Sequence, residues 1–389
     1  MFITTNQHHF KEDSFIVKPP TGGLLRNFTC FWYWHPESPL QFGRMLSSKA
    51  SPTVTLQFAE KHPELQTAGF YRQAQGLHIS SIGLGSYLGE TDDATDRGYT
   101  ASVEAALASG INLIDTSLNY RHQRSERALA GALRSAARES FVVCTKAGYL
   151  VPGAIPAEAL SEGEVVGGMH CMTASFLADQ LERSRANLDL ETIDVFYLHN
   201  PETQLSFVSR EEFYKRCLAA FESLERAVSD GRIGFYGAAT WNGFRAAPED
   251  RAYLSLSDLV DLARQVSGDS HHFRFVQLPF NLAMGEAYMR ANQGGKPLLA
   301  AAQDLNVSVI GSATLLQSRL SRDLPDHLAA LFPGTQTDAQ RAIQFSRSAP
   351  GLCASLIGMS SPEHVKENMH VAPLPPLNSG QFAGLFRRE

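Results

Sequence analysis

The stretch INLIDTSLNYRHQRSERALAGALRSAARESFVVCTK, residues 111–146, contains two short apolar runs separated by a longer helical pattern. NLIDTS at 112–117 and FVVCTK at 141–146 have the length of strands, whereas SERALAGALRSAA at 125–137 has the length of a helix. A strand, a helix and a second strand in this order form a βαβ unit, in which the two strands are parallel. The stretch therefore predicts a parallel sheet.

The same alternation continues on both sides of this stretch. LHISSIGL at 77–84 and YTASVEAALASG at 99–110 precede it as one strand and one helix. The later apolar runs are at 192–199, 233–240, 273–279, 306–312 and 352–358. The later helical patterns are at 175–188, 211–231, 256–268, 296–305, 337–348 and 361–369. Eight strand–helix pairs without a break in composition predict a single (β/α)8 barrel of the TIM type.

A Rossmann fold is the competing interpretation of the first strand. SSIGLGSYLG at 80–89 is rich in glycine, and Asp115 ends the second strand, where such a fold holds a ribose hydroxyl. The glycines, however, lead into ETDDATD at 90–96, whose four carboxylates would repel a pyrophosphate. The spacing G-x-G-x-x-G is also absent, which favours the barrel.

Residues 1–58 differ in composition from the rest of the chain. They have little periodicity and contain an aromatic cluster at Phe31–Trp34, so we predict a poorly ordered extension before a barrel domain at 59–389. A targeting segment is a less favoured interpretation, because Glu12 and Asp13 interrupt the basic character and no Arg-rich amphipathic helix is present.

Composition excludes several classes of protein. The net charge of -6 and a pI near 6.1 give no basic face for nucleic acid or for an anionic membrane. The five scattered cysteines favour a reducing compartment, so we expect a cytoplasmic protein without structural zinc. No apolar run is long enough to span a membrane. His271 and His272 are adjacent and would point to opposite faces of a strand, which disfavours a metal site there.

Four polar residues follow successive apolar runs. These are Asp115, Tyr120, Lys146 and His199, and the carboxyl ends of barrel strands share the rim that usually carries catalysis. A phenol with a pKa of about 10 is a poor acid unless an ammonium group and its partner carboxylate lower that pKa. Each residue alone has a structural explanation, such as a helix cap for Asp115. Together they predict a general acid for carbonyl reduction.

Several segments within about 76–370 resemble the aldo/keto reductase superfamily in content and order. They are, in order, SSIGLGSYLG, NLIDTSLNY, VVCTKAG, LERSRANLDLETIDVFYLHNP, GRIGFYGAATW, FVQLPFNL and LIGMSSPEHVKEN. The resemblance implies a (β/α)8 barrel that transfers a hydride between a nicotinamide cofactor, usually NADPH, and a carbonyl or alcohol. It also implies a catalytic tetrad: Tyr120 gives the proton, Lys146 lowers its pKa, Asp115 holds Lys146, and His199 orients the carbonyl oxygen.

The resemblance implies cofactor-binding residues as well. Where the family often has a Ser-Asn pair that holds the nicotinamide carboxamide, this chain has Ala239 and Thr240, so only Thr240 has a hydroxyl to offer. Gln277 matches a glutamine that contacts the same carboxamide. Trp241 lies beside this position, and two interpretations stay open for it: it covers the nicotinamide ring, or it packs as a structural aromatic residue. The residues that match the pyrophosphate and adenosine sites are Ser312, Leu316, Gln317, Gly358, Ser360, Ser361, His364, Glu367 and Asn368.

The junction at residues 358–364 weakens the preference for NADP(H) and leaves NAD(H) open. His364 occupies the position where the family often has arginine, and Gly358 occupies a frequent lysine position. A neutral imidazole cannot replace the bidentate, permanently charged guanidinium group that grips a 2′-phosphate. We therefore expect only a modest preference between the two cofactors.

Long loops after Lys146, Gln277 and the seventh strand are expected to act as lids that select a small carbonyl or alcohol substrate. The residues that would line an amphipathic pocket are Tyr149, Met169, His170, Phe280 and Trp241. This set of side chains does not favour any one of sugars, aromatic aldehydes, quinones and steroids as the substrate. The alternative function is a cofactor-sensing regulatory subunit with little turnover. A barrel without any cofactor is a third hypothesis.

Overall fold

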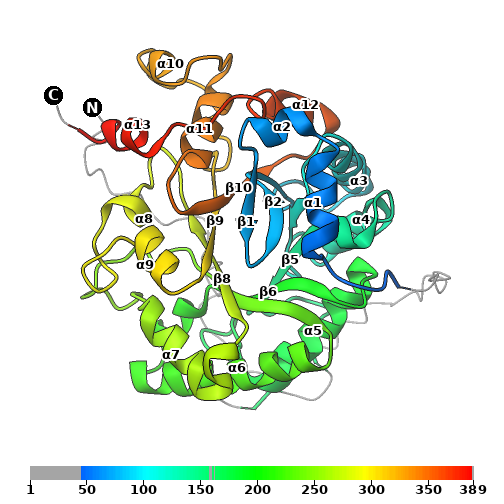
Figure 1. Cartoon of the computed structure of the whole chain (residues 1–389). Helices are drawn as coiled ribbons and strands as arrows, with labels where there is room; N and C mark the ends of the chain where they lie inside the picture. The colour runs from blue at the N-terminus through cyan, green and yellow to red at the C-terminus, as the bar shows by residue number, and fades with distance from the viewer. Residues whose placement is uncertain (1–44, 157–159, 162, 388–389) are drawn as a thin grey trace, which may run out of the picture.

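The computed structural model describes residues 45–156, 160–161 and 163–387, in which eight parallel strands close into a barrel surrounded by helices (Figure 1). Each strand pairs with its neighbour in sequence, and the last pairs with the first. The barrel strands are β3 (Ile82–Gly85), β4 (Leu113–Asp115), β5 (Val142–Ala147), β6 (Ile193–His199), β7 (Ile233–Ala239), β8 (Phe273–Pro279), β9 (Ser308–Ser312) and β10 (Leu352–Gly358). The predicted (β/α)8 barrel is confirmed, and the Rossmann interpretation is wrong because the sheet has no open edge.

Helices follow every barrel strand, as the alternating pattern predicted. In chain order they are α3 (Asp93–Ala108), α4 (Arg124–Leu133), α5 (Ala174–Leu188), α6 (Arg210–Ser229), α7 (Leu256–Ser267), α8 (Glu286–Met289), α9 (Leu298–Asp304), α10 (Leu328–Leu331), α11 (Asp338–Arg347), α12 (Pro362–Met369) and α13 (Ser379–Gly384). Short 3-10 turns lie at Arg138–Ser140, Pro201–Ser206 and Gly268–Ser270. None of the helices in the described ranges has the length and apolarity to cross a membrane.

The first apolar run is two strands and not one, so the prediction for 77–84 is wrong in detail. β2 (Leu77–Ser80) pairs antiparallel with β1 (Tyr71–Ala74), and the chain turns at Ser81 before it enters the barrel as β3. Leu77 and Ile79 pack with Leu113 and other inward-facing residues near the amino ends of the barrel strands. The hairpin therefore covers the amino-terminal end of the barrel, which leaves the carboxyl-terminal rim for chemistry.

The predicted boundary at residue 58 falls inside helix α1 (Pro52–Glu60), which α2 (Pro63–Thr67) follows. Ser51 caps α1 through its hydroxyl, and Pro52 occupies the first helical position. The backbone N–H of Leu46 donates to the carbonyl of Asp189 at 3.0 Å, so this segment is attached to the barrel. Residues 1–44, including the aromatic cluster at Phe31–Trp34, lie outside the described residues.

Candidate active site

The four residues predicted as a tetrad lie together at the carboxyl-terminal rim. Asp115 ends β4, Lys146 lies near the end of β5, His199 ends β6, and Tyr120 follows in the turn after β4. The Nζ atom of Lys146 is 2.6 Å from Asp115 Oδ1 and 3.4 Å from Tyr120 Oη. The rings of Tyr120 and His199 have their centroids 5.9 Å apart. The barrel thus brings an ammonium group, a carboxylate, a phenol and an imidazole into one site.

Burial dominates the electrostatics of this site. Burial raises the pKa of Tyr120. The positive charge of Lys146 lowers this pKa, and the negative charge of Asp115 raises it further. Lys146 lowers the pKa of Tyr120, as predicted, but burial has the larger effect and leaves this pKa above its ordinary value. Tyr120 is protonated at neutral pH, which is the state that a general acid needs.

The other members of the tetrad have defined charges. Burial lowers the pKa of Lys146, but attraction to Asp115 and Tyr120 outweighs it and leaves the pKa raised, so the ammonium form persists. Burial also raises the pKa of Asp115, and this effect exceeds the lowering of that pKa by the charge of Lys146 and by the hydrogen bond from Gln277. The pKa of His199 lies well below its usual value, mainly because the ring is buried and also because of the positive charge of Lys146. His199 is therefore a neutral hydrogen-bonding group.

Two further side chains support the tetrad directly. Gln277 on β8 donates from Nε2 to Asp115 Oδ2 at 2.8 Å, so both carboxylate oxygens of Asp115 are engaged. Ser117 Oγ lies 3.2 Å from His199 Nδ1. The helix-cap explanation of Asp115 is wrong, since α4 begins at Arg124 after Gln123. Sequence reasoning missed Ser117, because the contact joins residues 82 positions apart.

The loop after β7 contains an unpartnered polar group. Thr240 is buried, and its Oγ1 atom has no hydrogen-bond partner among the described residues. The three amides that follow, from Trp241 to Gly243, donate to Oε1 of Glu202 at 2.7, 3.0 and 3.3 Å. Glu202 therefore fixes the loop that carries Thr240. The sequence shows Glu202 only as an acid in a loop, so this function was not predicted.

The remaining predicted cofactor residues lie at the carboxyl ends of β9 and β10, which are neighbouring strands. Ser312 ends β9, and Leu316 and Gln317 in the following turn both have positive φ, 46° and 52°. Gly358 ends β10, and Ser360 precedes the N-cap of α12. On α12, His364 is exposed, Asn368 is buried, and Glu367 accepts from the Thr337 hydroxyl at 3.1 Å.

The structure places some of the aromatic residues predicted for the substrate pocket at the rim, but not all of them. The Tyr149 ring meets His170 and His199 edge-on, with centroids 5.2 and 5.1 Å apart. Phe280 is fully buried and stacks on Phe345, so its assignment to the substrate pocket is wrong. Tyr87 was not predicted, although it is 42% exposed and its ring centroid lies 5.0 Å from that of Tyr120.

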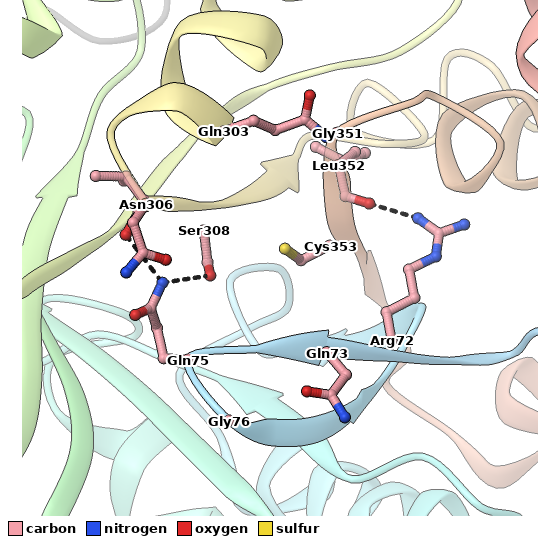
Figure 2. Close-up of a pocket in the computed structure, with 11 residues that line it drawn as sticks. Arg72, Gln73, Gln75, Gly76, Gln303, Asn306, Ser308, Gly351, Leu352 and Cys353 are labelled. Carbon is pink, nitrogen blue, oxygen red and sulfur yellow. Dashed lines mark hydrogen bonds between the residues drawn. The ribbon is translucent and has the colours of Figure 1, made fainter.

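A polar cavity of about 600 Å³ lies at the opposite end of the barrel, between the β1–β2 hairpin and the turns before β9 and β10 (Figure 2). Gln75 Nε2 donates to the Asn306 carbonyl and to Ser308 Oγ, both at 3.1 Å, and Arg72 donates to the Leu352 carbonyl. These groups hydrogen-bond to one another at the amino ends of the strands, so we assign the cavity no part in the chemistry.

Within the described ranges no group of three His, Cys, Asp or Glu side chains could hold a metal.

Comparisons with known proteins agree with this architecture. The model of the aldo/keto reductase family matches residues 81–385. An aldo/keto reductase from Klebsiella pneumoniae, solved in complex with NADP and acetate, has a TM-score of 0.57 at 20% identity, with 80% of this chain and 92% of that chain covered. The aldo-keto reductase from Bacillus halodurans gives 0.59 at 18% identity, with coverage of 82% and 96%.

A relative described as D-threo-aldose 1-dehydrogenase, from Pseudomonas sp, is 30% identical over 176 residues, or 42% of this chain. The match spans about half of that protein, 51%. The family match over most of the chain is decisive: the chain belongs to the aldo/keto reductase family. The predicted family and its enzyme class, an aldo/keto reductase-like oxidoreductase, are therefore confirmed.

Proposed function

We propose that this chain interconverts a carbonyl and an alcohol with a nicotinamide cofactor, and that Tyr120 is its general acid. The supporting observation is the position of Lys146 Nζ, within hydrogen-bond reach of both Asp115 and Tyr120. Such a buried ion pair against a phenol is costly to desolvate and has no evident structural need at a rim. The cytoplasm remains the compartment that we propose for it.

The proton steps follow from the protonation states of the site. A bound nicotinamide would supply or accept the hydride at the carbonyl carbon. Negative charge then grows on the carbonyl oxygen, and Tyr120 Oη gives its proton to that oxygen while Lys146 stabilises the phenolate that remains. Neutral His199 orients the oxygen through a hydrogen bond. In the oxidation direction Tyr120 takes the proton back.

The residues present fit a nicotinamide cofactor. The unpartnered Thr240 hydroxyl can bond a carboxamide, and Gln277 keeps its carbonyl oxygen available because only its N–H is used by Asp115. We propose Ser312, Leu316 and Gln317 for the pyrophosphate. For the adenosine part we propose Gly358, Ser360, His364, Glu367 and Asn368. The Klebsiella pneumoniae relative is described in complex with NADP, which supports NADP(H) as the first cofactor to test.

The 2′-phosphate should be held weakly, because His364 and Gly358 replace the cations of other family members. We expect the wild-type protein to prefer NADPH over NADH by about tenfold, or about 1.4 kcal/mol. His364→Arg should strengthen NADPH binding by about another tenfold and leave NADH binding unchanged, as measured by fluorescence titration.

His370→Arg is the matched control, since it makes the same exchange just beyond the other end of α12, at an exposed position. It should leave both dissociation constants unchanged. A wild-type protein that already prefers NADPH a thousandfold, or an equal gain from His370→Arg, would show that other residues hold the phosphate.

Aldoses are the first substrates to test, because the Pseudomonas relative is described as an aldose dehydrogenase. Cofactor oxidation or reduction with a panel of aldoses and aldehydes measures turnover directly. The alternative, a cofactor-sensing subunit with little turnover, predicts nicotinamide binding without steady-state rates on any member of the panel. A barrel that binds neither NADPH nor NADH would refute both functions.

A further inference from the structure

His170 connects the long loop after β5 to the main chain of the proposed catalytic His199. Its Nε2 atom lies 2.8 Å from the His199 carbonyl oxygen, and its Nδ1 atom lies 2.8 Å from Gln204 Nε2. Gln204 Oε1 in turn lies 2.7 Å from Nη1 of Arg216 on α6. His170 and Gln204 are both buried, with 1% and 0% of their surface exposed.

The direction of each hydrogen bond in this chain of contacts is determined by chemistry. A carbonyl oxygen can only accept, so His170 donates from Nε2 to His199. In a neutral imidazole the other nitrogen then accepts, and the amide N–H of Gln204 supplies that donor. The Gln204 oxygen accepts from Arg216, which has only donors. Burial lowers the pKa of His170 to about 4, which agrees with the neutral form.

Neighbouring residues pack closely against His170. A Cβ atom on Gly148 would lie 2.6 Å from the His199 carbonyl oxygen and 2.7 Å from His170 Nε2, so only glycine permits this approach. Tyr149 packs edge-on against both histidine rings, and its hydroxyl accepts from Asn200 Nδ2 at 2.9 Å. Gly148, Tyr149 and His170 are therefore held against the end of β6.

We propose that His170, Gln204 and Arg216 form a positioning chain that sets where His199 presents its ring to the substrate. None of the three needs to touch the substrate: they act through the His199 backbone and through the loop that they hold against the rim. This inference rests on the proposed function of His199. It gives the part of the β5–α5 loop around His170 a defined function, which is to hold the end of β6 in place.

His170→Ala should lower kcat for carbonyl reduction by about tenfold to a hundredfold, because a displacement of about 1 Å near a reacting group has effects of this size. The dissociation constant for NADPH should stay at the wild-type value. His170→Gln should restore most of kcat, since the glutamine Nε2 can donate to the same carbonyl. His271→Gln is the matched control, because His271 is equally buried but precedes β8 at the other end of the barrel.

Nitrogen-15 NMR of the histidine rings provides a test that does not depend on turnover. We expect His170 to be neutral with its proton on Nε2 at pH 7. Gln204→Glu places a carboxylate against Nδ1, so His170 should become doubly protonated in that variant. A proton on Nδ1 in the wild type, or an unchanged His170 signal in Gln204→Glu, would refute the chain even if His170→Ala fails to fold.

The outcomes also separate this inference from the proposed function. Wild-type kcat and KM in a folded His170→Ala protein refute the positioning chain while the reductase function stands. Absence of nicotinamide-dependent turnover in the wild type refutes the proposed function, and with it the catalytic consequence of the chain, whatever tautomer His170 shows.

Discussion

Tyr120→Phe lowers the turnover of carbonyl reduction by at least about a hundredfold and leaves the affinity for NADPH near the wild-type value. A general acid commonly contributes a factor of about 10² to 10⁴ to the rate, and removal of one hydroxyl takes away the proton but not the ring. Stopped-flow or steady-state oxidation of NADPH measures the rate, and fluorescence titration measures the affinity.

Tyr87→Phe is the matched control for this experiment. The Tyr87 ring lies 5.0 Å from that of Tyr120, centroid to centroid, whereas it is the Tyr120 hydroxyl that lies within hydrogen-bond reach of Lys146. Its loss should leave the rate within about twofold of wild type. Near-normal turnover in Tyr120→Phe would remove the tyrosine from the mechanism, and equal losses in both variants would point to packing at the rim as the cause.

Lys146→Met abolishes reduction and destabilises the fold, because it leaves the buried carboxylate of Asp115 without its ammonium partner. Among the residues that the structure describes, the amide of Gln277 is then the one remaining side-chain partner of Asp115. Breaking a buried pair in this way costs about 3 to 5 kcal/mol of unfolding free energy. Urea unfolding measures that loss. Lys215→Met, which removes an exposed ion pair with Glu211, should leave the urea midpoint close to that of the wild type, because water screens such a pair.

The same change has a predictable dependence on pH. Loss of Lys146 raises the pKa of Asp115 further, so the unfolded chain releases its proton more readily than the folded chain. The destabilisation is therefore present above the unfolded pKa of about 3.9 and is lost as the pH falls below it. The double variant Lys146→Met, Asp115→Asn should recover most of the stability and none of the turnover. A wild-type rate in Lys146→Met would show that the pair is structural.

The barrel could be predicted because its evidence is local. Each strand is a short apolar run followed by a helical pattern, and the polar residues at strand ends, such as Lys146 and His199, are brought together by the topology alone. The split between β2 and β3 was missed because the chain bends at a single residue, Ser81, within a continuous apolar pattern. Helix α1 was missed although Ser51 and Pro52 are a cap and a first-turn proline.

The supporting residues of the site could not be predicted, for a physical reason. Glu202 acts on amides 39 to 41 positions away, and His170 contacts a carbonyl 29 positions away. Such contacts depend on how two loops meet over a closed barrel, which no periodic pattern in the sequence reports. The net pKa of Tyr120 likewise depends on the depth of its burial, which cannot be read from residue types.

The hairpin that covers the amino-terminal end of the barrel has a consequence for proton traffic. Interior side chains such as Tyr197 and Phe275 belong to the same buried cluster as Leu77 and Ile79 of the hairpin, so packed apolar side chains fill this end of the barrel. In the mechanism that we propose, the substrate would bind at the carboxyl-terminal rim, where Tyr120 lies. Tyr120 would also have to regain a proton from solvent after each reduction. Reprotonation of Tyr120 and binding of the next substrate would then be sequential events at the same end of the barrel.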